Sequence, residues 1–99
     1  MSNIYFRMIT RESSSDAATQ AISFLHDRLA SIGIHHITKP VHIPYWKNAH
    51  FGELTCQCNT AIPFTQIQPL FATEWQSDTA DIQWSRIHIP GVCFLWISD

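Results

Sequence analysis

The segment from Asp16 to Ile32 most constrains what this chain can fold into. Its apolar residues recur at the spacing of one helical face: Ala18, Ala21, Ile22, Leu25, Leu29 and Ile32. The polar stretch RESSSD precedes it and suits a helix N-terminus, and Gly33 follows as a left-handed C-terminal stop. An amphipathic helix must bury its apolar face against another layer of structure. The rest of the chain therefore has to supply that layer.

Alternating and apolar runs predict strands for this second layer. NIYFRMI (residues 3–9) places Ile4, Phe6 and Met8 on one side and Tyr5 and Arg7 on the other, which is typical of a half-buried strand. The further predicted strands are IHHITKPVHI (34–43), HFGELTCQCN (50–59), DIQWSRIHI (81–89) and VCFLWIS (92–98). Pro40 indicates that the strand at 34–43 lies at a sheet edge or ends near this residue. PYWKN (44–48) is expected to be a loop. The last strand, at 92–98, should be the most buried.

A second helix is expected within AIPFTQIQPLFATEWQ (61–76), where Phe64, Ile67, Leu70, Phe71 and Trp75 follow helical spacing and Pro63 and Pro69 limit the regular part. The resulting order of elements is β-α-β-β-α-β with one more strand. It resembles the ferredoxin-like arrangement. We therefore expect a single α+β domain over residues 1–99, with an extra C-terminal strand and a sheet covered by two helices.

Composition and charge weigh against several classes of partner. The net charge is −2, and the six Lys and Arg residues are scattered along the chain, so direct nucleic-acid binding is not expected. No apolar run is long enough for a membrane span, and MSNIYFRMIT lacks the pattern of a signal peptide. Three cysteines are an odd number, which favours free thiols and a cytoplasmic location.

The histidine and cysteines in HFGELTCQCN raise the question of a metal site. In a strand, Cys56 and Cys58 share a face with Leu54, and their sulfurs are about 7 Å apart. A zinc site needs four converging ligands, commonly with C-x₂₋₄-C spacing. We therefore predict core cysteines, no metal and no cofactor. His35 and His36 are expected to face opposite sides of their strand, so at most one of them can join a site. His42, His50 and His88 remain unplaced by the sequence, and a histidine near a carboxylate could still act as a base.

No catalytic constellation stands out in the sequence. There is no G-x-S-x-G, no phosphate-cradling glycine loop among the three glycines and no obvious carboxylate dyad, so we do not expect an enzyme. Two stretches instead suit a protein interface: EWQSDTADIQW (74–84), with Glu74, Asp78, Asp81 and Trp84, and IPYWKN (43–48), with Tyr45 and Trp46. The simpler alternatives are a solvated loop for the first stretch and a folded-back lid for the second.

With these two stretches, the chain resembles bacterial toxin-immunity proteins of the contact-dependent inhibition type. The resemblance implies a small cytoplasmic protein, a monomer or weak dimer, that tightly binds one cognate protein toxin, often a nuclease. Acidic side chains would then meet the toxin's basic surface. The alternative is a small ferredoxin-like enzyme or ligand-binding domain similar to the dimeric α+β-barrel monooxygenases, in which aromatic and histidine side chains position an organic substrate. An effector-sensing regulatory domain is a third possibility.

Overall fold

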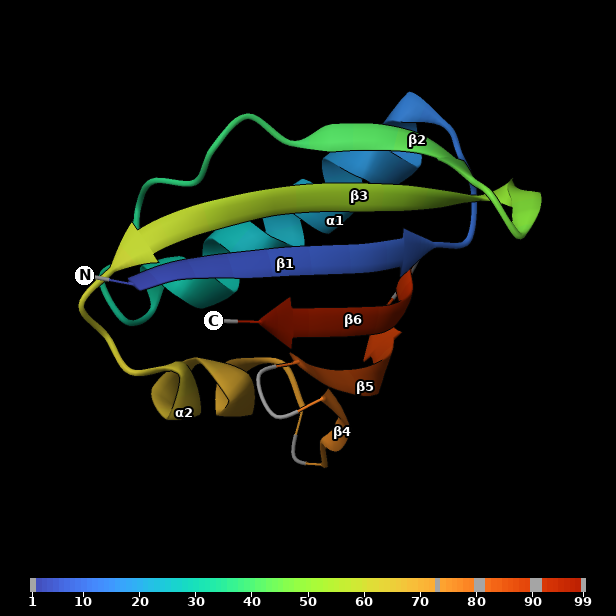
Figure 1. Ribbon diagram of the computed structural model, residues 1–99. Coiled ribbons are helices and arrows are strands. Elements are labelled where there is room, and N and C mark those ends of the chain that lie inside the picture. The colour runs from blue at the N-terminus through green and yellow to red at the C-terminus, as the bar shows by residue number, and fades with distance from the viewer. Residues whose placement is uncertain (1, 73, 80–81, 90–91, 99) are drawn as a thin grey trace.

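The computed structural model describes residues 2–72, 74–79, 82–89 and 92–98, with backbone only at residues 2, 78–79 and 82–89 (Figure 1). The chain forms one mixed α+β structure, as the sequence predicts. Its strands are β1 (Ser2–Thr10), β2 (Val41–Tyr45), β3 (Asn48–Thr60), β4 (Gln76–Thr79), β5 (Ile82–Ile89) and β6 (Val92–Ser98). Its helices are α1 (Ser15–Ala30), the short α2 (Phe64–Ile67) and the 3₁₀ turn η1 (Gln68–Leu70).

All strands join one antiparallel sheet in the order β2-β3-β1-β6-β5-β4. β3 lies between β1 and β2, and β6 lies on the other side of β1. The last strand is therefore internal, and the strands at the two edges are β2 and β4. α1 runs across one face of the sheet, behind β1 and β3 in the view of Figure 1.

Helix α1 confirms the strongest sequence prediction. The Ser14 hydroxyl caps its start by accepting a hydrogen bond from the Ala17 amide at 3.2 Å. At the other end, the Gly33 amide donates to the Ala30 carbonyl and the Ile34 amide to the Leu29 carbonyl, each at 3.0 Å. This pairing is a Schellman motif, and it needs the positive φ of 84° at Gly33.

The core lies between α1 and one face of the sheet. Its fully buried side chains come from alternate positions of the central strands and from the helical stripe: Ile4, Phe6, Met8, Ala21, Leu25, Leu29, Leu54, Cys58, Leu95 and Ile97. Phe71 closes one end of this layer, with its ring 5.9 Å from both Phe6 and Phe24 in edge-to-face geometry. Half-buried Trp75 also packs against this core, and its indole N–H donates to the Ala72 carbonyl at 3.1 Å.

Three sequence predictions about elements were wrong. Residues 34–40 are not a strand, because Ile34 completes the cap of α1 and is buried there, and strand pairing starts only at Val41. Pro44 and Tyr45 belong to β2, so the expected loop at 44–48 is much shorter. The second helix starts directly after Pro63, as the sequence predicts, but it extends only over Phe64–Ile67, and residues Gln76–Thr79 form the unexpected strand β4.

Candidate functional site

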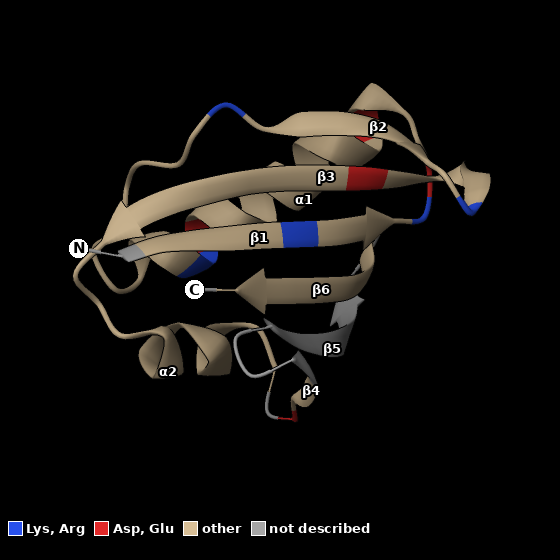
Figure 2. Cartoon of the chain, viewed as in Figure 1, with Lys and Arg blue, Asp and Glu red and all other residues tan. Residues whose placement is uncertain are grey.

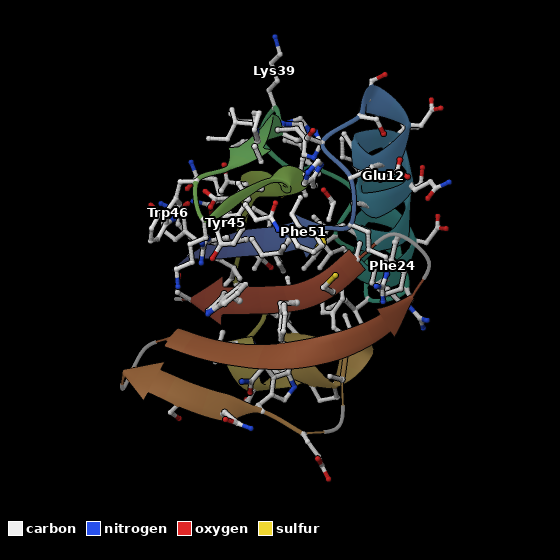
Figure 3. All side chains as sticks on the ribbon, turned by 90° about the vertical axis from the view of Figure 1, so that its right-hand side faces the viewer. Glu12, Phe24, Lys39, Tyr45, Trp46 and Phe51 are labelled. Carbon is white, nitrogen blue, oxygen red and sulfur yellow. The ribbon has the colours of Figure 1, made fainter. Side chains whose placement is uncertain are left out.

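The face of the sheet turned away from α1 is covered by no helix of the described chain (Figures 1 and 3). We call it the open face. Cross-strand partners share a face of a sheet, and the register therefore places these residues on it: Tyr5, Arg7 and Ile9 of β1; Val41 and Ile43 of β2; Glu53, Thr55 and Gln57 of β3; and Phe94, Trp96 and Ser98 of β6.

Large apolar side chains are exposed on the β2 half of this face. Tyr5, Val41 and Ile43 are 49%, 55% and 50% exposed, and Trp46, in the turn after β2, is 77% exposed. Single exposed apolar residues are ordinary on protein surfaces, whereas a contiguous group marks an interaction site. Among the residues whose side chains the structure describes, these four are the large exposed hydrophobics.

Arg7 lies at the centre of the open face and organises its aromatic side chains. Its guanidinium carbon lies 4.6 Å from the centre of the Trp96 ring and 5.7 Å from that of Tyr45. Its Nη2 donates to Glu53 Oε2 at 2.9 Å, and both side chains are partly exposed. Cation–π contacts and the ion pair together fix the guanidinium in one orientation. The centre of the face is therefore ordered and electrically neutral.

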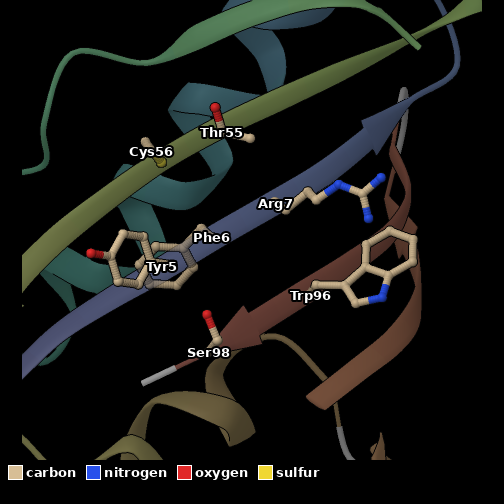
Figure 4. Close-up of a pocket in the computed structure, with 7 residues that line it drawn as sticks. All are labelled: Tyr5, Phe6, Arg7, Thr55, Cys56, Trp96 and Ser98. Atoms are coloured by element: carbon tan, nitrogen blue, oxygen red, sulfur yellow. The ribbon is translucent and has the colours of Figure 1, made fainter. Parts of the chain in front are cut away.

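Two adjoining hollows mark the open face. The first encloses about 400 Å³ and is lined by Tyr5, Phe6, Arg7, Thr55, Cys56, Trp96 and Ser98 (Figure 4). The second encloses about 430 Å³ and is lined by Tyr5, Thr38, Lys39, Val41, Thr55, Cys56 and Gln57. Tyr5, Thr55 and Cys56 line both, so the two hollows adjoin each other across β1 and β3.

The structure places five of the six residues that the sequence singled out, and it does not bring these five together. Tyr45 and Trp46 lie together at the β2–β3 turn, with their ring centres 6.0 Å apart and Lys47 Nζ 5.2 Å from the Trp46 ring (Figure 3). Exposed Glu74 precedes β4, where Asp78 lies. Asp81 is outside the described residues, and Trp84 is a β5 residue paired with Trp96. β2 and β4 are opposite edges of the sheet, so Tyr45 and Trp46 lie far from Asp78.

Sequence reasoning missed most of the open face. Tyr5 and Arg7 were correctly assigned to the polar side of their strand, but nothing in the alternation said that no other element would cover that side. Val41 and Ile43 were counted as part of a longer strand without a face. The sequence signal that could have added Val41 and Ile43 to the candidate site is their position, as two β-branched residues, just before Tyr45 and Trp46.

A partly buried polar cluster lies at the C-terminal end of β1, on the core side of the sheet. The Thr10 hydroxyl donates to the Glu12 carbonyl at 2.6 Å. That hydroxyl has one hydrogen, so His42 Nε2, 3.0 Å away, must donate to it. Burial lowers the pKa of His42, which favours the neutral ring. The contact with the Thr10 hydroxyl then places the ring hydrogen on Nε2. The structure thus gives this histidine a structural contact.

Gly52 makes this cluster possible, and replacing it should destabilise the fold. A Cβ at this position would collide with His42 Nε2 and Thr10 Oγ1 and lie 2.9 Å from the Glu12 carbonyl oxygen. We expect Gly52→Ala to cost about 1–3 kcal/mol of unfolding free energy, the range for an overpacked site. Urea melts measure this loss. The double variant with His42→Ala should lose less than the sum of the two single losses, and simple additivity would contradict the proposed collision.

The two neighbouring cysteines lie in the core, as predicted. Cys56 and Cys58 are buried beside Leu54. Burial, reinforced by the adjacent Cys58, raises the pKa of the Cys56 thiol to about 12, and burial also raises that of Cys58. His50, by contrast, is exposed. In the described part of the chain, no group of three or more His, Cys, Asp or Glu residues is placed to hold a metal ion.

Thiol labelling at pH 8 tests this arrangement. The thiolate is the reactive form, and it is scarce well below the pKa. In the folded protein we expect half-buried Cys93 to react first and Cys56 and Cys58 to react only after unfolding in guanidinium. Mass spectrometry of the labelled peptides identifies each site. Labelling of Cys56 as fast as Cys93 in the folded state would contradict its position in the core.

No protein-family model, curated protein or solved structure matches this chain. None of the helices in its described part has the length and apolar character needed to cross a bilayer. The chemistry of the open face is therefore the main guide to function.

Proposed function

We propose that this chain is a small cytoplasmic binding protein that neutralises a cognate bacterial toxin, and that it binds through the β2 half of the open face. One observation supports the binding surface: Tyr5, Val41, Ile43 and Trp46 all expose large apolar side chains on or beside this face, and Tyr5 and Val41 line the same hollow. Trp and Tyr are the residues that most often dominate binding energy at protein interfaces.

The side chains at the centre of this surface are already held in place before any partner binds, which favours binding. Arg7 is already held between Tyr45 and Trp96 and paired with Glu53. A side chain that is fixed before binding loses little conformational entropy when the complex forms. The central strands β1 and β3 carry much of the face, so a partner would meet a rigid platform.

We also propose that the fold is an elaborated ferredoxin-like arrangement. In support, β3 lies between β1 and β2, and β6 occupies the place beside β1 where the fourth strand of that arrangement would lie. β4 and β5 would then be an insertion between α2 and the last strand. Such a sheet has one face covered by helices and one face left for binding.

The direct test is binding to the product of the neighbouring gene. The purified chain should bind that protein tightly, and co-expression should protect cells from it. Asp78→Ala and Asp81→Ala, each checked for folding by circular dichroism, test the acidic stretch separately. If either carboxylate pairs with a toxin cation, its loss should weaken binding by about 2–5 kcal/mol. If both variants bind the toxin like the parent at low and at high salt, the acidic stretch is not part of the interface, which is then restricted to the open face.

A small-molecule function is the second candidate, because one observation favours it. The hollow of about 400 Å³ falls within the range of ligand pockets, and it combines a guanidinium with the Tyr5 and Trp96 rings. A monooxygenase-like enzyme or ligand-binding domain would use this hollow. Turnover of a small organic substrate, with no binding of a neighbour-encoded protein, would replace the toxin proposal.

A further inference from the structure

Charge is unevenly distributed between the two sides of the sheet. On the open face Arg7 and Glu53 neutralise each other, which leaves the exposed lysines at its β2 edge. Lys39 lines the second hollow, and Lys47 lies over the Trp46 ring. Glu12, Asp16 and Asp27 lie instead in the loop before α1 and on that helix, where Arg11 and Arg28 offset only part of their charge (Figure 2). The β2 edge is therefore locally positive although the chain as a whole carries −2.

The two lysines bracket the exposed apolar residues in sequence and in space. Lys39 precedes β2, and Lys47 follows it in the turn. Between them, Val41 and Ile43 point to the same side about 7 Å apart, as alternate residues of a strand do. The surface thus presents a short apolar row with a cation at each end.

We propose that the β2 edge of the open face binds an acidic, apolar segment of a protein partner. Apolar side chains of that segment cover Val41, Ile43 and Tyr5, and its carboxylates lie near Lys39 and Lys47. This inference rests on the proposed function and specifies the partner's surface. A basic, phosphate-facing cleft of a toxin would be repelled here, so the open face docks outside such a cleft.

Charge and side-chain type distinguish this partner from two others. A second copy of the chain, docked through the same surface, would bring Lys39 and Lys47 of both copies into one interface. Glu53 could not neutralise them, because its carboxylate is already paired with Arg7. A single-stranded nucleic acid needs a series of aromatic rings for stacking. The middle of this row is aliphatic, and Val and Ile offer no ring to a base.

Selection from a random peptide library tests the proposal without knowledge of the partner. The folded protein is the target, and the Ile43→Asp variant is used for counter-selection. We expect enriched peptides rich in Asp, Glu and large apolar residues. Lys39→Glu combined with Lys47→Glu should weaken the selected peptides at least tenfold at low salt and less at high salt. Gln20→Glu, an exposed change on α1, is the matched control and should leave affinity unchanged.

Several results would overturn this inference. The selection could enrich basic or uncharged peptides, it could enrich peptides that bind the Ile43→Asp variant equally well, or it could enrich no peptide at all. Saturable binding of an eight-nucleotide RNA that depends on Tyr5 and Trp46 would favour nucleic acid instead, and a Tyr5-dependent dimer in sedimentation would favour a second copy. If the toxin is neutralised but basic peptides are selected, only this inference fails. If acidic peptides are selected but no toxin is neutralised, the proposed function fails alone.

Discussion

Trp46→Ala is expected to lower the affinity for the protein partner at least about thirtyfold, which corresponds to a loss of about 2–4 kcal/mol. The Trp46 side chain is 77% exposed, and its ring lies beside Tyr45 and Lys47 in the same turn region. Its surface is therefore available to a partner, and its removal should leave the core intact. Isothermal titration with the neighbour-encoded protein measures the change.

The matched control for this variant is Gln20→Ala. Gln20 is exposed on α1, on the covered side of the sheet, so its truncation should change neither folding nor binding. Both variants should melt at the temperature of the parent within error. If Trp46→Ala binds the partner with the affinity of the parent, the β2–β3 turn is not part of the interface. If Gln20→Ala binds more weakly than the parent, the interface lies on the helix side instead.

Leu25→Ala is expected to destabilise the protein by about 2–5 kcal/mol, the range for a truncated core leucine. Leu25 is fully buried in the cluster between α1 and the sheet. Alanine there leaves a cavity that rigid neighbours on the central strands can fill only in part. Because a small domain is stable by only about 5–15 kcal/mol, this single change removes much of its stability.

Guanidinium melts at constant temperature measure this loss, with Ser23→Ala as the control. Ser23 is an exposed residue of the same helix, and alanine has the higher helix propensity, so this variant should be as stable as the parent or slightly more so. A loss below about 0.5 kcal/mol in Leu25→Ala would mean that another face of α1 packs on the sheet.

The sequence was most informative where local and tertiary preferences agree. The apolar stripe of α1, its cap at Ser14 and its stop at Gly33 all point to the same helix, and the observed bounds differ from the prediction by at most two residues. β1 and β3 were predicted almost in full because their alternation matches one buried and one open side. The burial of Cys56 and Cys58 followed from the same alternation.

Prediction failed where a residue serves a neighbouring element or where prolines interrupt a pattern. Ile34 has the character of a strand residue, but it packs under the end of α1 instead. Pro63 and Pro69 reduce a helical apolar pattern to one short helix and a 3₁₀ turn. β4 contains Gln, Ser, Asp and Thr without an apolar alternation, and only pairing with β5 makes it a strand.

The candidate site was predictable only in part for a related reason. Tyr45 and Trp46 are recognisable from sequence as aromatic residues beside a turn. The contributions of Tyr5, Arg7 and Ile43 depend on which face of the sheet the helices leave open, and that is a property of the packed molecule. The strand order, which separates β2 from β4, also follows from tertiary pairing.

Amide hydrogen exchange of the protein, free and bound to its partner, tests the central claim most directly. If the β2 half of the open face is the interface, binding should slow exchange at residues 41–47 and around Tyr5 and Thr55. Exchange in α1 should stay nearly unchanged, because the helix lies on the other side of the sheet. Slowed exchange confined to residues 74–84, or to α1, would contradict the assignment of the open face as the binding surface.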